Sequence, residues 1–260
     1  MTTPKVATIK RGGSRFYVHP ETGEKVPGVT SVLNMIPKPF LKFWAAKLVA
    51  EASIDQLPAF IGMVMAGDRD GAVDYLKRAP MRSTGAAAAR GTEAHEIFEK
   101  LALGESVGRV HPDMKWAVSH FHEFLDAFEP EFLHIEGTVW NPSPGYAGSF
   151  DSIAQIGDEL VIIDNKTTRS GVFPEVGLQL NAYASADFLM AKDGERSPMP
   201  KLDAAAVLHV VPDGWKFVPI LLDADLLMPV FEALLKVFEW DRVISKTVIG
   251  DAVVVGEVSP

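Results

Sequence analysis

Two aspartates and a lysine near the ends of two adjacent β-rich runs are the side chains best suited to chemistry in this sequence. Asp151 closes the run Gly-Ser-Phe-Asp. Twelve residues separate it from Asp-Asn-Lys, which contains Asp164 and Lys166. A hairpin between the runs puts both carboxylates at one end of a sheet, and the i, i+2 spacing puts Asp164 and Lys166 on one face. Two carboxylates beside a cation at a strand end predict a site for a hard divalent metal.

Four further side chains have the types and spacings to reach the same site. His95 lies in the middle of an expected helix, Gln179 and Tyr183 are one turn apart on a later helix, and Glu136 begins a β-rich run. Each has an ordinary structural alternative, as a packed helix histidine, a polar pair on a helix or a strand residue. A lone Asp-x-Lys is likewise typical of a surface ion pair that contributes little stability. Taken one by one, these residues leave both interpretations open.

The composition limits which site chemistries are open. The chain has 260 residues, of which 47% are hydrophobic, and it contains no cysteine. These values are typical of a globular protein of one or two domains, and they exclude a disulfide, an iron–sulfur cluster and a thiolate zinc site. The N-terminal residues lack the apolar segment of a secretory signal, and no apolar run has the length of a membrane span. We therefore expect a cytoplasmic protein without a membrane partner.

The pattern of apolar residues predicts an α/β fold, with a mixed central sheet flanked by helices and a mainly helical region before it. We expect an N-terminal arm and helical region over 1–84 and a core over 85–260. In the amino-terminal region we expect a hairpin over 15–36 and helical segments to about 82, with breaks near Pro58 and Gly67. The core should begin with a helix from Ser83 or Thr84 to Gly104 and a helix over 112–128, followed by three strands within 134–168. A helix over 176–191, two strands around Asp213-Gly214 and a helix over 224–243 should complete it.

Charge is distributed unevenly along the chain. Residues 1–90 hold 13 of the 25 lysines and arginines but only 7 of the 34 acidic residues, whereas the remainder is strongly acidic. This asymmetry indicates a polyanion-facing surface joined to a carboxylate-rich part, although charges on solvated faces give the same counts. In the basic region, Phe40, Phe43 and Trp44 are expected to form the core face of a helix, with stacking on an unpaired base as the alternative.

Taken together and in order, these motifs resemble the RecB-like branch of the PD-(D/E)XK nuclease superfamily. The matching elements are RGTEAH with His95, the strand with Glu136, GSFD, IIDNKT and QLNAYA, within about residues 85–190. The N-terminal KVPGVTSVL and KPFLKFWAA are similar to the start of phage-encoded RecB-like exonucleases. Many family members carry a four-cysteine iron–sulfur cluster, which this chain cannot hold. The resemblance is therefore to the cysteine-free, phage-type members and implies a restriction-endonuclease-like core.

The resemblance also implies a role for each site residue. His95, Asp151, Asp164 and the backbone carbonyl of Asn165 hold one or two Mg²⁺ or Mn²⁺ ions, and the histidine favours Mn²⁺. Lys166 orients the attacking water or stabilises the transition state as a fixed charge, not as a base. The remaining roles fall to residues that hold the DNA or assist the metal: Gln179, Tyr183, Thr167 and Arg90 as DNA contacts, and Glu136 as an outer-shell or second-metal ligand.

We therefore expect a metal-dependent DNA exonuclease that serves phage DNA replication or recombination in the host cytoplasm. DNA is the expected partner, together with a phage recombination or annealing protein. Two alternatives stay open, a structure-specific endonuclease similar to a junction resolvase and a catalytically silent DNA-binding module on the same core. An intact set of His95, Asp151, Asp164 and Lys166 argues against the silent module, because degenerate members usually lose one of these residues.

Overall fold

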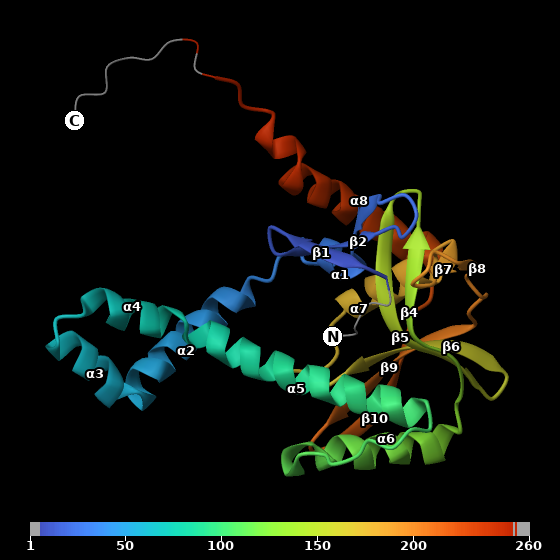
Figure 1. Ribbon diagram of the computed structural model, residues 1–260, viewed down its shortest axis with the longest axis horizontal. Coiled ribbons are helices and arrows are strands. Elements are labelled where there is room, and N and C mark those ends of the chain that lie inside the picture. Colours follow the sequence, from blue (N-terminus) through green and yellow to red (C-terminus); the bar gives the residue numbers. More distant parts are fainter. Residues whose placement is uncertain (1–5, 252, 254–260) are drawn as a thin grey trace.

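A seven-stranded mixed sheet forms the centre of the protein, which was analysed as a computed structural model (Figure 1). The structure describes residues 6–251 and 253. The start of the expected 1–84 segment and the end of the expected 85–260 core therefore lie outside the described residues. The strand order is β10-β9-β6-β5-β4-β7-β8, in which β6 and β9 are parallel and the other neighbours antiparallel. The strands of this sheet are β4 (Glu131–Asn141), β5 (Tyr146–Ile156), β6 (Glu159–Lys166), β7 (Phe188–Met190), β8 (Arg196–Pro198), β9 (Ala204–Val211) and β10 (Gly214–Ile220).

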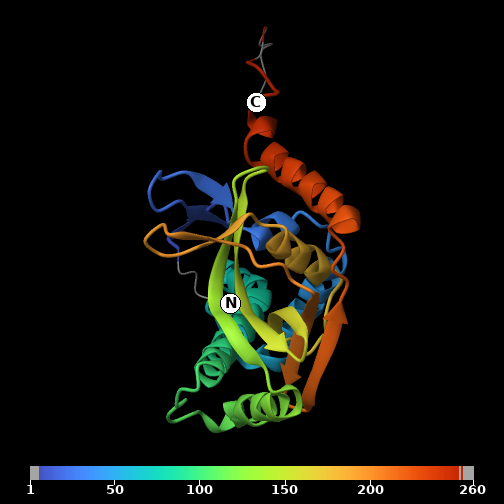
Figure 2. The ribbon, with the colours of Figure 1, turned by 90° about the vertical axis from the view of Figure 1, so that its right-hand side faces the viewer.

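Helices cover both faces of this sheet. The helices are α1 (Val29–Leu33), α2 (Phe40–Asp55), α3 (Leu57–Met65), α4 (Arg69–Lys77), α5 (Ala79–Ala102), α6 (Lys115–Phe128), α7 (Glu175–Ala184) and α8 (Ala224–Arg242). One face packs against α5 and α6, and the other against α1, α7 and α8 (Figure 2). The expected α/β class and mixed sheet flanked by helices are therefore confirmed.

A second, three-stranded antiparallel sheet lies against β4 and β5. It consists of β1 (Thr8–Arg11), β2 (Ser14–Val18) and β3 (Lys25–Pro27), in that order. Tyr17 and Val26 pack with Trp140 and Ala147 in a small buried cluster. The amino-terminal segment therefore shares a core with the main sheet, and the expected boundary after residue 84 falls inside α5, which runs without a break.

Most expected elements form where local signals are strong. Pro58 lies in the first turn of α3, and Gly67, with a φ of 79°, follows its end, so both predicted breaks are confirmed. The strands around Asp213-Gly214 and the helix that follows Pro174 are also present. Gly104 adopts a φ of 71° just after α5, as expected for the residue that ends a helix.

Three local predictions are wrong, because packing outweighs the local signal. The β-rich stretch after Gly28 forms α1, whose residues are almost all buried against α7 and α8. Helix α5 begins at Ala79, so Thr84 is an interior residue whose hydroxyl donates to the carbonyl of Pro80. The helix expected over 176–191 ends at Ala184, and the residues beyond it form β7 at the edge of β4.

Helices α2, α3 and α4, with the first turns of α5, project from the body as an arm (Figure 1). Phe40 and Phe43 in α2 are 53% and 79% exposed, so the expectation that they form a core face is wrong. The ring of Phe40 instead stacks on that of Phe173, which precedes α7. Within the described residues no single helix meets both the length and the apolar composition of a membrane span, although α2 and α3, bent by 78°, meet them as a pair.

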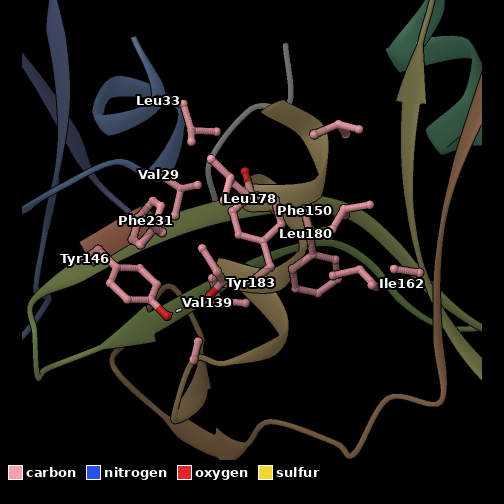
Figure 3. Packing of buried hydrophobic residues seen from close by; sticks show 14 of the residues in the cluster. Val29, Leu33, Val139, Tyr146, Phe150, Ile162, Leu178, Leu180, Tyr183 and Phe231 are labelled. Atoms are coloured by element: carbon pink, nitrogen blue, oxygen red, sulfur yellow. Dashed lines mark hydrogen bonds between the residues drawn. The ribbon is translucent and has the colours of Figure 1, made fainter. Parts of the chain in front are cut away.

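The largest buried cluster lies between the central sheet and α1, α7 and α8. Figure 3 shows three members of this cluster, Tyr183 from α7, Phe150 from β5 and Ile162 from β6. Gly148 makes this packing possible, because a Cβ atom there would lie 2.3 Å from Cε1 of Tyr183. The glycine of the Gly-Ser-Phe-Asp run therefore lets α7 approach β5 closely, which brings Gln179 and Tyr183 towards the strand that carries Asp151.

Candidate active site and metal centre

Strand register brings the acidic residues of β4, β5 and β6 together. Ser152 on β5 lies opposite Ile163 on β6, so the neighbouring positions Asp151 and Asp164 are adjacent, as the sequence predicts. On the other side of β5, the flanking pairs of the β4–β5 register place Glu136 opposite Asp151. The three carboxylates therefore come from three neighbouring strands. All three are buried, with exposed fractions of 4% to 6%.

His95 completes a group of three residues that can hold a metal ion. One ligand atom from each of His95, Glu136 and Asp151 lies within 4.8 Å of the others. His95 Nδ1 is buried without a hydrogen-bond partner and lies 3.5 Å from Oδ1 of Asp151. With metal–ligand bonds of about 2.1 Å, ligand atoms at right angles are separated by about 3.0 Å, and opposite ones by about 4.2 Å. The 3.5 Å between His95 Nδ1 and Asp151 Oδ1 lies between these two values, and an imidazole with two carboxylates is a ligand set that a divalent ion can use.

The backbone at Glu136 is unusual and aims the side chain at this group. Glu136 has a φ of 55°, in the left-handed region that few residues other than glycine adopt. The following residue, Gly137, leaves room for the ring of Phe150, because a Cβ atom there would lie 2.1 Å from Cζ of that ring. Backbone strain of this kind is a feature of functional sites, where the surrounding structure maintains it. Glu136 is therefore part of the group of three rather than a distant outer residue.

Asp164 lies outside this group and makes a different set of contacts. Lys166 Nζ lies 2.6 Å from Asp164 Oδ2, and Gln179 Nε2 donates a hydrogen bond of 2.7 Å to Oδ1. Gln179 Nε2 also donates to the hydroxyl of Tyr183 at 3.3 Å. The Asn165 backbone N–H donates to Asp151 Oδ2 at 2.6 Å, which links the two carboxylates through the β6 backbone.

Burial and charge set the protonation of this cluster. Burial raises the pKa of Asp164, and the nearby charge of Asp151 raises it further, while Lys166 opposes both. Burial alone would lower the pKa of Lys166, but the charges of Asp164 and Asp151 outweigh burial and raise it. Lys166 therefore stays protonated at neutral pH. Burial also raises the pKa of Tyr183, so its hydroxyl stays neutral.

These residues line one cleft of about 310 Å³. His95, Asp151, Asp164, Asn165 and Lys166 all face it, and the additional predicted residues that line it are Thr167, Gln179 and Tyr183. Two predicted residues do not line the cleft: Arg90, which is exposed on α5, and Glu136. Glu136 borders a smaller cavity of about 10 Å³ behind Asp151, lined by the rings of the α5–α6 core.

The amino-terminal sheet supplies a wall of the cleft that the sequence analysis missed. Arg15 and Tyr17 from β2 and Thr30 from α1 line the same cavity. The Tyr17 hydroxyl and Ser149 Oγ are 3.0 Å apart, and Ser31 Oγ accepts from the Arg15 backbone N–H at 2.8 Å. No local pattern marks these residues, because only the packing of β2 on β5 places them near Asp151.

Comparisons with known proteins leave the chain without a family assignment. No family model and no curated protein matches the chain. Among solved structures, it is similar to the crystal structure of SSO0001, with 12% sequence identity over 82% of this chain and 96% of that one. The TM-score of that match is 0.31.

Proposed function

We propose that the chain is a RecB-like nuclease with a PD-(D/E)XK core, which hydrolyses phosphodiester bonds of DNA with the help of a divalent metal. The observation that carries this proposal is the juxtaposition of two units along one cleft. One unit is the group His95, Glu136 and Asp151, of which His95 and Asp151 line the cleft, and the other is the Asp164–Lys166 ion pair. The motif order along the sequence gives independent support, because the same residues match the family pattern.

His95, Glu136 and Asp151 would hold the metal. An Mg²⁺ or Mn²⁺ ion bound there supplies a water of lowered pKa and positive charge beside the scissile phosphate. The imidazole favours Mn²⁺, because sites made only of oxygen ligands suit Mg²⁺ better. In this assignment Glu136 is a direct ligand, and the main work of Asp164 is to hold Lys166.

Lys166 acts as a fixed positive charge in the cleft. Its ammonium is held by Asp164 at 2.6 Å, and its side chain remains one-third exposed. Because Asp164 and Asp151 raise its pKa, Lys166 cannot take a proton from water and instead stabilises negative charge that develops on the phosphate. Holding this charge in place before the reaction avoids reorganisation during it.

Gln179 and Tyr183 are positioning residues in this proposal. Gln179 donates to Asp164 Oδ1, which leaves Oδ2 directed to Lys166. Tyr183 is 1% exposed and supports Gln179 from the core side. Their direct contacts are with the protein, so they orient the Asp164–Lys166 pair. We also propose that Gln179 contacts DNA, because Gln179 lines the cleft.

The dimensions of the cleft favour action at DNA ends over cutting within a duplex. Its volume of about 310 Å³ is at the lower end of the range for small-molecule sites, about 300–1,000 Å³. A wall from Arg15, Tyr17 and Thr30 faces α5 across it. Such a cleft suits a single strand near its terminus better than the middle of a duplex, which is stiff over a persistence length of about 50 nm. A role in phage replication or recombination, with an annealing protein as partner, rests on the amino-terminal resemblance.

One plasmid in two forms tests the exonuclease proposal. Relaxed covalently closed and linearised DNA of equal mass are incubated with the protein and Mn²⁺, and the products are separated by size. We expect degradation of the linear form to short products and survival of the circle. Equal cutting of both forms would favour the endonuclease, and no cutting of either would favour the silent DNA-binding module. Asp158→Asn, in the exposed turn between β5 and β6, serves as a matched control that should retain activity.

A further inference from the structure

Helix α8 carries two apolar stripes, and among residues 6–251 and 253 only one of them packs against the protein. The inner stripe includes the fully or nearly buried Phe231 and Phe238 and the partly buried Leu227, Leu234 and Leu235, which contact the core beneath α1 and α7. This inner stripe is sufficient to attach α8 to the body. Attachment of α8 to the body therefore does not require apolar residues on the other side of the helix.

The outer stripe is apolar and follows a heptad pattern. Its members are spaced alternately four and three residues apart: Leu226, Val230, Ala233, Val237, Trp240 and, just after the helix, Ile244. All six are exposed, and the five large ones have exposed fractions of 40% to 58%. At about 100° per residue, this stripe lies on the side of the helix opposite Phe231 and Phe238. We call these six residues the α8 seam.

The spacing of the α8 seam is that of the contact line between two helices in a coiled coil. Leu226, Ala233 and Trp240 take the d positions, and Val230 and Val237 take the a positions. In parallel coiled coils, β-branched residues at a with leucine at d favour two strands. The α8 seam has valine at both a positions and leucine at the first d position.

Charge beside the seam is complementary to a second copy of the same helix. Lys236 lies at a g position and Asp241 at the following e position, five residues later. In a parallel two-stranded coiled coil, the g residue of one helix meets that e residue of the other, so each dimer would form this ion pair twice. Asp241, which lies 3.2 Å from Arg242 Nε, keeps a half-exposed side chain that a second copy can reach.

The position of α8 leaves the seam accessible. Figures 1 and 2 show α8 on the outside of the molecule. The inner side of its carboxyl-terminal half contacts the β1–β2 hairpin, where Phe238 packs on Phe16 and Arg242 donates to the carbonyl of Gly12. A lipid surface is a poorer match, because the exposed charges beside the seam are mainly acidic, namely Asp225, Glu232 and Glu239. Membrane-surface helices instead carry lysine and arginine on the polar face.

We infer that two copies of this chain associate through their α8 seams, as a short parallel coiled coil. The seam is shorter than the three to four heptads of a self-sufficient coiled coil, so the dimer forms in a concentration-dependent way. This inference does not depend on the nuclease proposal, and its tests need no DNA or metal.

Sedimentation of the full-length protein tests the dimer. We expect the measured mass to rise from one chain towards two with increasing concentration. Val237→Lys places a charge in the seam and should keep the protein monomeric, whereas Met65→Lys, at an exposed apolar position in α3, should behave like the unmodified chain. A monomer at every concentration, or a Val237→Lys variant that still dimerises, would overturn the inference.

Disulfide formation tests the parallel arrangement, because the chain contains no cysteine of its own. Ala233→Cys at a d position should form a covalent dimer on mild oxidation, since facing d residues come within the Cα separation of a disulfide, about 4.4–6.8 Å. Glu232→Cys, next in the chain but turned away from the seam, should form far less. Equal cross-linking of both variants would contradict the arrangement. Vesicle binding by the unmodified monomer that Val237→Lys abolishes would instead assign the seam to lipid.

Discussion

The side-chain amide of Gln179 donates a hydrogen bond to Asp164 Oδ1 at 2.7 Å, from α7 to the end of β6. Both residues are buried, and the other carboxylate oxygen faces Lys166 at 2.6 Å. One carboxylate is thus held from two sides, by a neutral donor and by a cation. This contact explains how a helix that follows the strand in sequence determines the geometry of a lysine in the cleft.

Replacing Gln179 by leucine should destabilise the fold and lower turnover together. The leucine fits the space but leaves Asp164 Oδ1 buried without its donor, which costs about 1–3 kcal/mol. Urea unfolding of the metal-free protein measures this loss. Gln56→Leu, at an exposed position between α2 and α3, should change the free energy of unfolding little. Equal stability of the Gln179→Leu variant and the unmodified protein would show that the hydrogen bond contributes nothing.

Asp164→Asn should make the metal-free protein more stable at neutral pH. Burial raises the pKa of Asp164 in the folded state, so ionisation of this carboxyl above its unfolded pKa of about 3.9 weakens the fold. Asparagine mimics the protonated carboxyl and avoids this loss. The gain in free energy of unfolding should be absent at pH values below about 3.9 and should grow as pH rises through the folded pKa. A gain that is the same at acid and neutral pH would contradict the assignment.

Metal affinity should depend on the group of three more than on Asp164. Asp151→Asn, Glu136→Gln and His95→Ala should each weaken Mn²⁺ binding in calorimetric titration by more than the ~10–100-fold typical of outer-shell changes. Glu131→Gln, at the exposed start of the same strand as Glu136, is the matched control and should bind normally. Unchanged affinity in Glu136→Gln would remove Glu136 from the ligand set and leave it the outer-shell role, one of the two roles that the sequence predicted.

Gly148→Ala should destabilise the protein by about 1–3 kcal/mol, as expected for overpacking. The new methyl group would lie 2.3 Å from Cε1 of the buried Tyr183, so either α7 or β5 has to move. The comparison variant is Gly62→Ala in α3, where no atom lies within 4 Å of the added Cβ. That change should have the opposite sign, because alanine is the better helix former. Thermal or urea unfolding of both variants decides the matter.

The acidic pair and its lysine were predictable because they depend on local signals. A hairpin between two β-rich runs brings Asp151 and Asp164 to adjacent positions, and an i, i+2 spacing places Lys166 beside Asp164. The role of Glu136 was not predictable in the same way. Its approach to the metal group depends on a left-handed backbone of φ 55°, for which the sequence has no marker beyond the glycine that follows.

Contacts between distant segments account for the other differences. Arg15 reaches the cleft only because β2 packs on β5, more than 130 residues later in the chain, where Tyr17 and Ser149 meet. The short strand β7 was missed because its residues continue a helical pattern, and its pairing with Trp140 in β4 outweighs that pattern. Arg90 was expected at the phosphate, but it is exposed on α5 and does not line the cleft.

The most direct test of the central claim changes one residue, Lys166, that is expected to affect cleavage but not metal binding. Release of nucleotides from linear duplex DNA is measured with Mn²⁺ and with a chelator, for the unmodified protein, Lys166→Ala and the exposed control Lys201→Ala. We predict Mn²⁺-dependent release by the unmodified protein and the control, and a loss of at least about 100-fold in Lys166→Ala with metal affinity retained. Release at the normal rate by Lys166→Ala, or no release by the unmodified protein at any metal concentration, would contradict the account.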